Sequence, residues 1–322
     1  MVIIIGAGPI GLACAIELKQ RNVGCMVIEK GCLVNSIFNY PTNMTFFSTS
    51  DKIEIGGIPF ISHGPKPTRR EALEYYRRVY EHYKLDVRVY EAVQNLERTG
   101  GRFTVTTSKA VYQADKLILA TGFFDIPHRM DVPGENLPKV KHYFDEPHPY
   151  AGLPVLVVGA GNSAVDVALE CYRCGSDVTM VIREAEIKKS VKYWVRPDIE
   201  NRIHEGSIRA YFNSRVVEIR EHEVVLATPE GERVQKNDFV FAMTGYEPNY
   251  KLLEMAGVAF NDDEFRTPVF DQKNQMSNVE GIYLAGVVCG GLHTGKWFIE
   301  NSIVHAGRIA YHITDSKKRI LK

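Results

Sequence analysis

The stretch Val2-Ile-Ile-Ile-Gly-Ala-Gly-Pro-Ile-Gly11 decides the fold, because it joins an uninterrupted apolar run to a glycine-rich turn. An apolar run without polar alternation is typical of a parallel strand that is covered on both faces. In the GxGxxG pattern, Gly6 allows a tight turn, Gly8 lets backbone amides approach a pyrophosphate, and Gly11 permits close helix packing. The stretch therefore predicts a strand, a turn and a helix that together bind a dinucleotide.

A carboxylate at the end of the next strand supports this interpretation. Residues 25–29 form a second short strand that ends in Glu29, eighteen residues after Gly11. At this position a carboxylate accepts hydrogen bonds from the hydroxyl groups of a ribose. A strand, a glycine loop, a helix, a second strand and an acid in this order predict a nucleotide site far more specifically than a glycine pattern alone.

The same arrangement returns 153 residues later in Leu156-Val-Val-Gly-Ala-Gly-Asn-Ser-Ala164, which matches GxGxxA. The strand expected at residues 178–182 is followed by Arg183, where the first unit has Glu29. A carboxylate repels a 2′-phosphate, whereas an arginine pairs with it bidentately. Arg183, with Lys188 nearby, therefore favours NADPH over NADH at the second loop.

Two dinucleotide loops in one chain imply a flavin and a nicotinamide that exchange hydride. We expect an α/β fold of two doubly wound, Rossmann-like domains, each with three layers (ββα), in which the NADPH domain is inserted into the FAD domain. Residues 1–122 and 246–322 are assigned to a discontinuous FAD-binding domain, and residues 123–245 to the NADPH-binding domain.

The remaining segments of the first domain are predicted from local patterns. Thr68-Arg-Arg-Glu71 is a capping box that opens a helix reaching Tyr83. Short alternating runs predict a β-meander, and they lie at residues 87–96, 103–107 and 111–113. A closing helix is expected from about residue 298 to residue 313.

Composition and charge narrow the class of protein. The 322 residues include 39 Lys and Arg against 39 Asp and Glu, so no global charge favours nucleic acid or an anionic membrane. No apolar run approaches the ~20 residues of a membrane span. Six cysteines are too few for a disulfide scaffold, and no secretory signal precedes the first loop. We expect a cytoplasmic protein with no nucleic-acid or membrane partner.

Further motifs are similar to those of known flavoproteins. A resemblance to the two-domain flavoproteins typified by low-molecular-weight thioredoxin reductases rests on Ala120-Thr-Gly122, Met243-Thr-Gly245 and Gly281-Ile-Tyr-Leu-Ala-Gly286. A narrower similarity to the YpdA-type bacillithiol-disulfide reductases rests on Asn39-Tyr-Pro-Thr42, Leu137-Pro-Lys-Val-Lys-His-Tyr-Phe144 and Trp297-Phe-Ile-Glu-Asn301. The resemblance covers nearly the whole chain. It implies a homodimer that holds FAD, oxidises NADPH and reduces a low-molecular-weight thiol disulfide.

The chain departs from both families in its cysteines. Thioredoxin reductases carry a redox CxxC before the second glycine loop, whereas residues 128–154 contain no cysteine here. Members of the bacillithiol-type family that have a thiol role carry a cysteine inside the first loop, where this chain has Ile10. Cys171 and Cys174 also form a CxxC sequence, but they lie on a predicted helix. A disulfide across one helical turn is strained, so we do not expect this pair to be a redox centre.

Three residues are left as catalytic candidates. Cys289 follows Gly286 in a region expected to face the flavin, Cys14 lies one helical turn after the first glycine loop, and His293 lies in a glycine-rich segment. No spaced set of histidines and carboxylates suggests a metal. The acid that usually follows the last glycine and holds the ribityl chain is Val287 here, so flavin contacts there must come from the backbone or from neighbours.

The cofactor-binding residues follow from the two loops and the resemblance. For FAD, the predicted residues are Gly6, Gly8, Pro9, Gly11, Glu29, Lys30, Tyr40, Ser48, Val93, Thr121, Gly122, Gly286 and Val287. For NADPH, they are Gly159, Gly161, Asn162, Ser163, Ala164, Arg183, Lys188 and Gly245.

The electron acceptor stays open at this point, because Ile10 removes the expected thiol. A thiol disulfide leads, and a reductase for a small electron-carrier protein, ferredoxin or flavodoxin, is the main alternative. The third alternative is a flavin monooxygenase, and the fourth is a non-enzymatic NADPH sensor with the same fold.

Overall fold

The computed structural model describes residues 1–320, with side chains up to residue 315. The chain divides into two compact units. Unit 1 comprises Met1–Asn39, Asn43–Ile126 and the chain from Tyr246 onward, and unit 2 comprises Tyr40–Thr42 and Pro127–Gly245. Unit 1 thus continues to Ile126, four residues beyond the boundary expected at residue 122.

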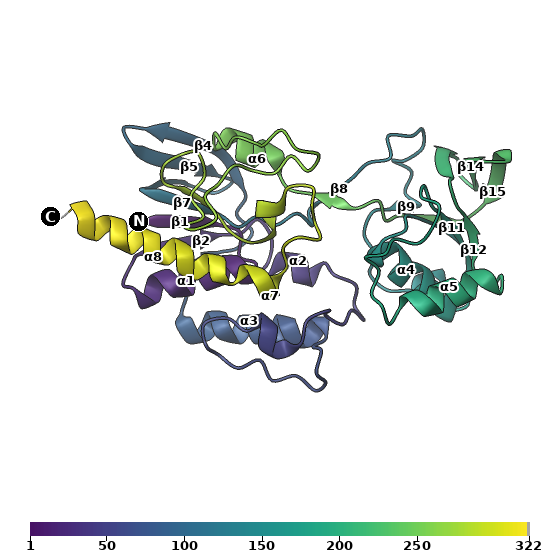
Figure 1. Cartoon of the computed structure of the whole chain (residues 1–322), viewed down its shortest axis with the longest axis horizontal. Coiled ribbons are helices and arrows are strands. Elements are labelled where there is room, and N and C mark those ends of the chain that lie inside the picture. The colour runs from purple at the N-terminus through teal and green to yellow at the C-terminus, as the bar shows by residue number, and fades with distance from the viewer. Residues whose placement is uncertain (321–322) are drawn as a thin grey trace. The chain divides into compact units, whose positions relative to one another are not determined.

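Unit 1 is built on a five-stranded parallel sheet. Its strands follow the order β18 (Ile282–Leu284), β7 (Lys116–Leu119), β1 (Val2–Ile5), β2 (Cys25–Ile28) and β3 (Val87–Arg88). The β-branched residues of β1 are buried on both faces, as a central parallel strand requires. Helices α1 (Pro9–Gln20) and α8 (Val304–Ile320) lie on one side of the sheet (Figure 1). The doubly wound α/β fold is confirmed.

A three-stranded antiparallel sheet forms the third layer of unit 1, on the side away from α1 (Figure 1). It contains β4 (Val93–Thr99), β5 (Arg102–Thr107) and β6 (Val111–Ala114). Leu96 and Val105 face each other in its register and are buried in the core. The expected meander is confirmed except at its start, because Val87 pairs with Val27 in the parallel sheet instead.

Unit 2 repeats the plan with a second five-stranded parallel sheet. The strands follow the order β12 (Arg209–Tyr211), β11 (Asp177–Val181), β10 (Pro154–Val158), β16 (Phe239–Ala242) and β9 (Val140–Lys141). Helices α4 (Asn162–Arg173) and α5 (Arg196–His204) pack against it through one apolar core. Strands β13 (Arg215–Ile219), β14 (Glu223–Thr228) and β15 (Gly231–Lys236) form an antiparallel sheet that contributes to a second core.

The capping box opens α3 (Arg69–Tyr83), as predicted: the Thr68 hydroxyl accepts from the Glu71 amide, and the Glu71 carboxylate accepts from the Thr68 amide. The closing helix is not continuous, because α7 (Ile299–Ser302) ends before α8 begins. The Ser302 hydroxyl donates to the Phe298 carbonyl, and such back-bonding bends helices.

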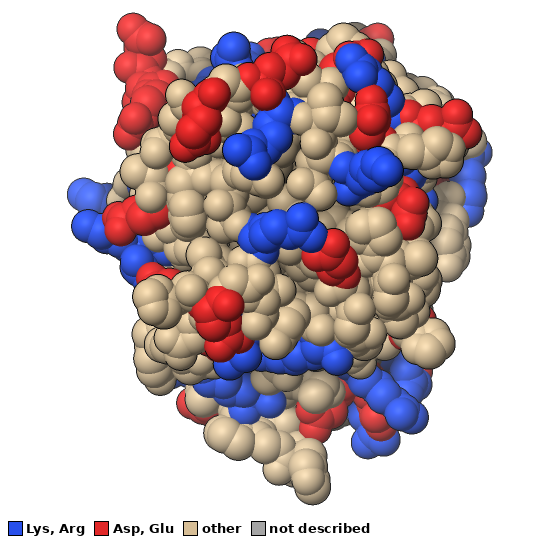
Figure 2. All heavy atoms as spheres, turned by 90° about the vertical axis from the view of Figure 1, so that its right-hand side faces the viewer, with Lys and Arg blue, Asp and Glu red and all other residues tan. Residues whose placement is uncertain are grey.

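The shorter elements complete the chain. They are α2 (Asn35–Phe38), η1 (Ser50–Ile53), β8 (Ile126–Pro127), η2 (His148–Tyr150), β17 (Tyr246–Glu247), α6 (Tyr250–Met255) and η3 (Gly286–Gly290). Within the described residues, every helix is too short or too polar to cross a membrane. On the face drawn in Figure 2, Lys and Arg side chains alternate with Asp and Glu, and neither sign dominates a large area.

Candidate functional site

The first glycine loop lies between β1 and α1, and two of its glycines are required by close packing. Gly6 has φ +107°, and a Cβ there would lie 2.4 Å from the carbonyl oxygen of Ala120. A Cβ on Gly11 would lie 1.9 Å from the carbonyl oxygen of Gly6. Both contacts involve backbone atoms, so the loop cannot close around larger residues.

Gly8 differs from these two glycines because the space around it is open. It is the N-cap of α1 with an ordinary φ of −69°, and a Cβ there would meet no protein atom within 4 Å. Pro9 follows at the first helical position, where its missing N–H costs nothing. Packing therefore does not explain Gly8, whereas the approach of a phosphate group to the helix N-terminus does.

Glu29 follows β2 directly and is nearly buried. Its Oε2 accepts a hydrogen bond from the Ala7 amide at 2.8 Å, and its Oε1 accepts one from the Gly31 amide at 2.9 Å. Burial raises the pKa of this carboxyl group above its usual value, although the two amides oppose the shift. Each oxygen retains a lone pair, which a ribose hydroxyl group can use as an acceptor.

A cleft in unit 1 surrounds this carboxylate. Of the predicted FAD residues, it is lined by Gly6, Glu29, Lys30, Val93, Thr121 and Gly122. The Oγ1 atom of Thr121 is buried without a hydrogen-bond partner among the described residues. A buried hydroxyl group without a partner is costly, so this atom indicates that a polar ligand belongs in the cleft.

The residues present fit the adenosine diphosphate half of FAD. Gly8 leaves room for a pyrophosphate, Glu29 accepts from a ribose, and Thr121 has a hydroxyl group to donate. Sequence reasoning missed several residues that line the same cleft, because they come from segments far apart in the chain that carry no motif. They include Glu91, Phe123, Asp125 and Asn249. Asp125 forms an ion pair of 2.9 Å with Lys30.

The second glycine loop, between β10 and α4 of unit 2, has the same geometry. Gly159 has φ +128°, and a Cβ there would lie 2.5 Å from the Met243 carbonyl oxygen and 3.3 Å from the Ala164 Cβ. Gly161 is the N-cap of α4 with φ −90°, and nothing lies within 4 Å of a Cβ on it. Each loop thus has a packed glycine and an open one, and the open position again suits a pyrophosphate.

Cationic side chains gather beyond the end of β11. The Arg183 side chain is 84% exposed, and its guanidinium lies 3.6 Å from the Glu184 carboxylate. The Lys188 ammonium lies 3.3 Å from the same carboxylate. Glu184 therefore holds two cations near each other, and both remain accessible to a phosphate group.

A loop that the sequence did not single out packs on the second glycine loop. The Asn162 side chain accepts from the Lys192 amide at 2.9 Å and donates to the Ser190 carbonyl at 3.2 Å. The Lys192 ammonium pairs with Asp166 of α4 at 2.8 Å. These contacts assign Asn162 a structural task, while the neighbouring Ser163 side chain is exposed.

Three other predicted residues, Ser48, Tyr40 and Gly245, are not among those that line the cleft at Glu29. The Ser48 hydroxyl donates to Glu300 at 2.7 Å. Tyr40 clusters with unit 2, where the neighbouring Thr42 amide donates to the Asp145 carbonyl. Gly245, with φ +104°, also belongs to unit 2. Their roles toward cofactors stay predictions.

The three catalytic candidates have contrasting surroundings. Cys14 and Cys289 are at most 1% exposed, and burial raises the pKa of each thiol far above its usual value. Only the thiolate is a good nucleophile, so both sulfurs are poorly placed to attack a disulfide. His293 is exposed and stacks on the Phe265 ring, with ring centroids 4.6 Å apart.

All six cysteines are free thiols, which includes Cys171 and Cys174 of the CxxC sequence. We predict that a thiol reagent modifies Cys174 and Cys32 in the native protein long before Cys14 and Cys289. Because the buried thiols require local unfolding, their modification should be on the order of a hundredfold slower than in denaturant. Peptide mapping by mass spectrometry measures this, and equal rates for Cys289 and Cys174 would contradict the buried assignment.

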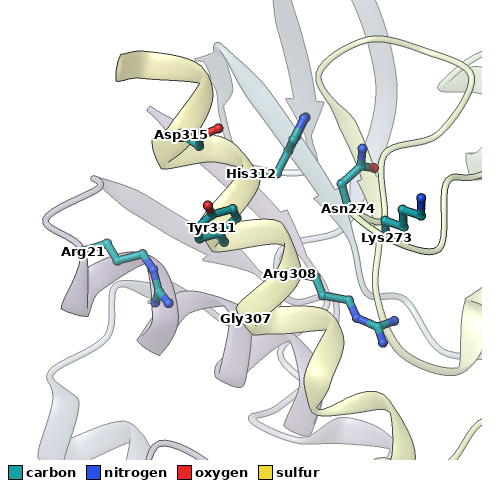
Figure 3. Close-up of a pocket in the computed structure, with 8 residues that line it drawn as sticks. All are labelled: Arg21, Lys273, Asn274, Gly307, Arg308, Tyr311, His312 and Asp315. Carbon is teal, nitrogen blue, oxygen red and sulfur yellow. The ribbon is translucent and has the colours of Figure 1, made fainter. Parts of the chain in front are cut away.

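A larger cavity, of about 640 Å³, lies in unit 1 beside α8 and contains none of the predicted site residues (Figure 3). Arg21, Lys273 and Arg308 line it together with Tyr311 and residues nearby. Arg21 pairs with Glu17, and Arg308 donates to the Gln272 carbonyl at 3.0 Å. These side chains are engaged locally, and we assign the cavity no role. No group of three or more potential metal ligands occurs in the described part of the chain.

Comparison with known proteins adds to this geometry. A family model described as pyridine nucleotide-disulphide oxidoreductase matches residues 3–286. Bacilliredoxin reductase Bdr of Bacillus subtilis is 47% identical over 97% of this chain and 96% of its own length. The structure of bacillithiol disulfide reductase Bdr (YpdA) from Bacillus cereus superposes with a TM-score of 0.96 at 42% identity, covering 98% of this chain and 99% of its own. The same reductase from Staphylococcus aureus superposes with a TM-score of 0.95 at 41% identity, covering 98% of both chains.

Proposed function

Because the chain belongs to the pyridine nucleotide-disulphide oxidoreductase family, we propose that it reduces a thiol disulfide with electrons from NADPH. Bound FAD supplies the chemistry by accepting hydride and passing the two electrons on. The observation that carries the proposal is the pair of open glycines, Gly8 and Gly161, each at the start of a helix in its own Rossmann-like unit. One chain with two such sites suits a flavin and a nicotinamide.

The protein's own residues bind and orient the cofactors in this proposal. Glu29 accepts hydrogen bonds from the ribose of FAD, and the amides that follow Gly8 face its pyrophosphate. Arg183 and Lys188 pair with the 2′-phosphate of NADPH, which makes NADPH the preferred donor. The net reaction converts one disulfide, NADPH and a proton into two thiols and NADP⁺.

The substrate class follows from the relatives. Two of the similar solved structures are bacillithiol disulfide reductases, and the similar Bacillus subtilis protein is named for bacilliredoxin. We therefore propose bacillithiol disulfide, a low-molecular-weight thiol disulfide, as the substrate. Because Ile10 replaces the loop cysteine and Cys14 and Cys289 are buried, the disulfide would receive its electrons from the flavin without the thiols of Cys14 and Cys289.

One observation favours a second candidate function. Electron transfer to a ferredoxin or flavodoxin requires no thiol, and the buried cysteines fit that reaction equally well. The same chain is 27% identical over 88% of its length to a ferredoxin–NADP reductase of Ignicoccus hospitalis. We also propose that the protein is a homodimer, as the family resemblance implies, and that it works in the cytoplasm, which suits a chain with only six cysteines.

Steady-state oxidation of NADPH against a panel of acceptors tests the function. The panel contains bacillithiol disulfide, oxidised bacilliredoxin, flavodoxin, ferredoxin and a quinone. We expect bacillithiol disulfide to give the highest kcat/KM. A flavodoxin or ferredoxin that exceeds every disulfide would replace the proposal with the carrier reductase.

The preference for NADPH is expected to depend on Arg183. Loss of one charge-assisted hydrogen bond to phosphate should weaken NADPH by about 10- to 100-fold in Arg183→Ala, while NADH changes little. Arg209→Ala is a matched control, because Arg209 pairs with Asp177 at the opposite end of β11. Dissociation constants for both nucleotides measure the effect. Equal losses for NADPH and NADH would show that Arg183 does not contact the 2′-phosphate.

A further inference from the structure

His305, in the first turn of α8, is a fully buried histidine with one bonded and one unbonded ring nitrogen. Its Nδ1 accepts a hydrogen bond from the Gly286 amide at 3.1 Å. An accepting nitrogen carries no proton, so the proton of the ring is on Nε2. Burial, with help from Arg308, lowers the pKa of this histidine to about 4, which keeps the ring neutral at physiological pH.

The second nitrogen has no conventional partner. Nε2 of His305 and Nε1 of Trp297 are both buried without a hydrogen-bond partner among the described residues. The two rings meet edge to face, with centroids 4.6 Å apart and planes at 73°. An edge-to-face pair of rings is a favourable packing contact, and it helps to hold the imidazole in one orientation.

The bond partner of His305 lies beside the predicted FAD site. Gly286 has φ +82°, and a Cβ there would lie 3.3 Å from the Cβ of Ile10, inside the first glycine loop. A Cβ on Gly122, which lines the cleft at Glu29, would lie 3.9 Å from a methyl group of Val287. The turn that begins at Gly286 thus lies between the imidazole and the nucleotide cleft.

Because of the side chain at position 287, contacts between this turn and a flavin depend on how the backbone of the turn is oriented. Val287 stands where the resembled flavoproteins have an acid, and a valine side chain cannot hydrogen-bond to a cofactor. Polar contacts from this turn to a flavin therefore come from its backbone. The direction of a backbone amide or carbonyl depends on the peptide planes on both sides of it, and His305 fixes the one at Gly286.

A catalytic pairing of His305 with Cys289 is a weaker explanation. The Cys289 sulfur lies 4.0 Å from Nδ1, but that nitrogen already accepts from Gly286 at a much better distance. The same thiol also points to Gln275, at 3.8 Å from its Oε1. Burial raises the pKa of Cys289, and a neutral imidazole without a free acceptor nitrogen does not take the thiol proton.

We propose that His305 is a positioning residue for the flavin: through Nδ1 it fixes the Gly286 peptide, and it thereby holds the turn Gly286–Gly290 against the bound cofactor. This inference rests on the proposed function, because it requires FAD at the first glycine loop. It concerns a residue that touches the turn and not the cofactor.

The test compares two substitutions of His305 that differ in one acceptor atom. In His305→Asn, the side-chain oxygen takes the place of Nδ1 and keeps the bond to Gly286, whereas His305→Leu removes it. We expect His305→Leu to weaken FAD binding by about 5- to 100-fold, the usual effect of leaving a buried amide without its acceptor. His305→Asn should remain near the wild type.

Two readouts separate positioning from general stability. One is the dissociation constant of FAD, measured by flavin fluorescence on the apoprotein, and the other is the reduction potential of the bound flavin, measured by dye equilibration. Both should change in His305→Leu and stay near wild type in His305→Asn. His312→Leu is the matched control, because His312 lies two turns later on α8 and bonds to the Tyr283 hydroxyl instead.

The outcomes distinguish this inference from the proposed function. If the wild type binds no FAD, both are wrong. If the wild type binds FAD and His305→Leu matches it in affinity and potential, only the role of His305 is overturned. Should His305→Leu fail to fold, His305→Gln carries the test, because its oxygen takes the place of Nε2. A wild-type affinity and potential in His305→Gln would overturn the role.

Discussion

Gly8→Val should produce a folded protein without FAD, and therefore a colourless one. The backbone at Gly8 has a φ that any residue adopts, and no protein atom lies within 4 Å of the added Cβ. The valine side chain would instead occupy the space that the pyrophosphate needs. Flavin absorbance of the purified protein and thermal unfolding of the apoprotein measure the two parts of this prediction.

Gly11→Val is the control for Gly8→Val. Its Cβ would lie 1.9 Å from the carbonyl oxygen of Gly6, so this substitution should destabilise the fold itself. A yellow Gly8→Val protein with normal FAD affinity would contradict the assignment of the first loop to the flavin pyrophosphate.

Gly161→Val should have the second large effect, which is loss of reduction by NADPH in a protein that keeps its FAD. Gly161 is also an N-cap with an ordinary φ, and the space around its Cβ position is open. The substitution therefore leaves unit 2 folded but blocks the nicotinamide nucleotide. Stopped-flow absorbance after anaerobic mixing with NADPH measures the loss of flavin reduction.

Dithionite provides the control for this variant, because it reduces the flavin without a nucleotide site. It should bleach Gly161→Val as fast as the wild type. If NADPH reduced Gly161→Val at the wild-type rate, the second glycine loop would not be the nicotinamide site. The pair Gly8→Val and Gly161→Val thus assigns one cofactor to each loop.

The two glycine loops could be predicted from the sequence because their chemistry is local. The spacing of the glycines reflects contacts within one strand–turn–helix unit, such as that of Gly11 with Gly6, and Glu29 follows the next strand at a fixed distance. The backbone carbonyls that also crowd Gly6 and Gly159 come from Ala120 and Met243, which the motif does not contain. The alternation of apolar residues likewise predicted the antiparallel sheet β4-β5-β6. Its failure at Val87 has a simple reason, since a two-residue strand carries too little pattern to choose between a parallel and an antiparallel partner.

The cleft around Glu29 and the environment of His305 could not be predicted in this way. Asn249 and Asp125 reach the cleft from segments separated by more than a hundred residues, and neither lies in a motif. His305 appears in the sequence as one histidine in an amphipathic helix, and only the fold brings it to the Gly286 amide. The burial of Cys289 is also a tertiary property, because the residues around it are mostly glycines and valines that occur on surfaces as well.

The central claim is that electrons pass from NADPH through the flavin to a disulfide without the two cysteines that the sequence offers as catalytic residues, Cys14 and Cys289. The most direct test is an anaerobic experiment on a variant in which Cys14 and Cys289 are both replaced by alanine, with flavin absorbance as the signal. NADPH should bleach this variant as it bleaches the wild type, and bacillithiol disulfide added afterwards should restore the colour at the wild-type rate. A variant that is bleached normally but stays reduced in the presence of the disulfide would contradict the claim.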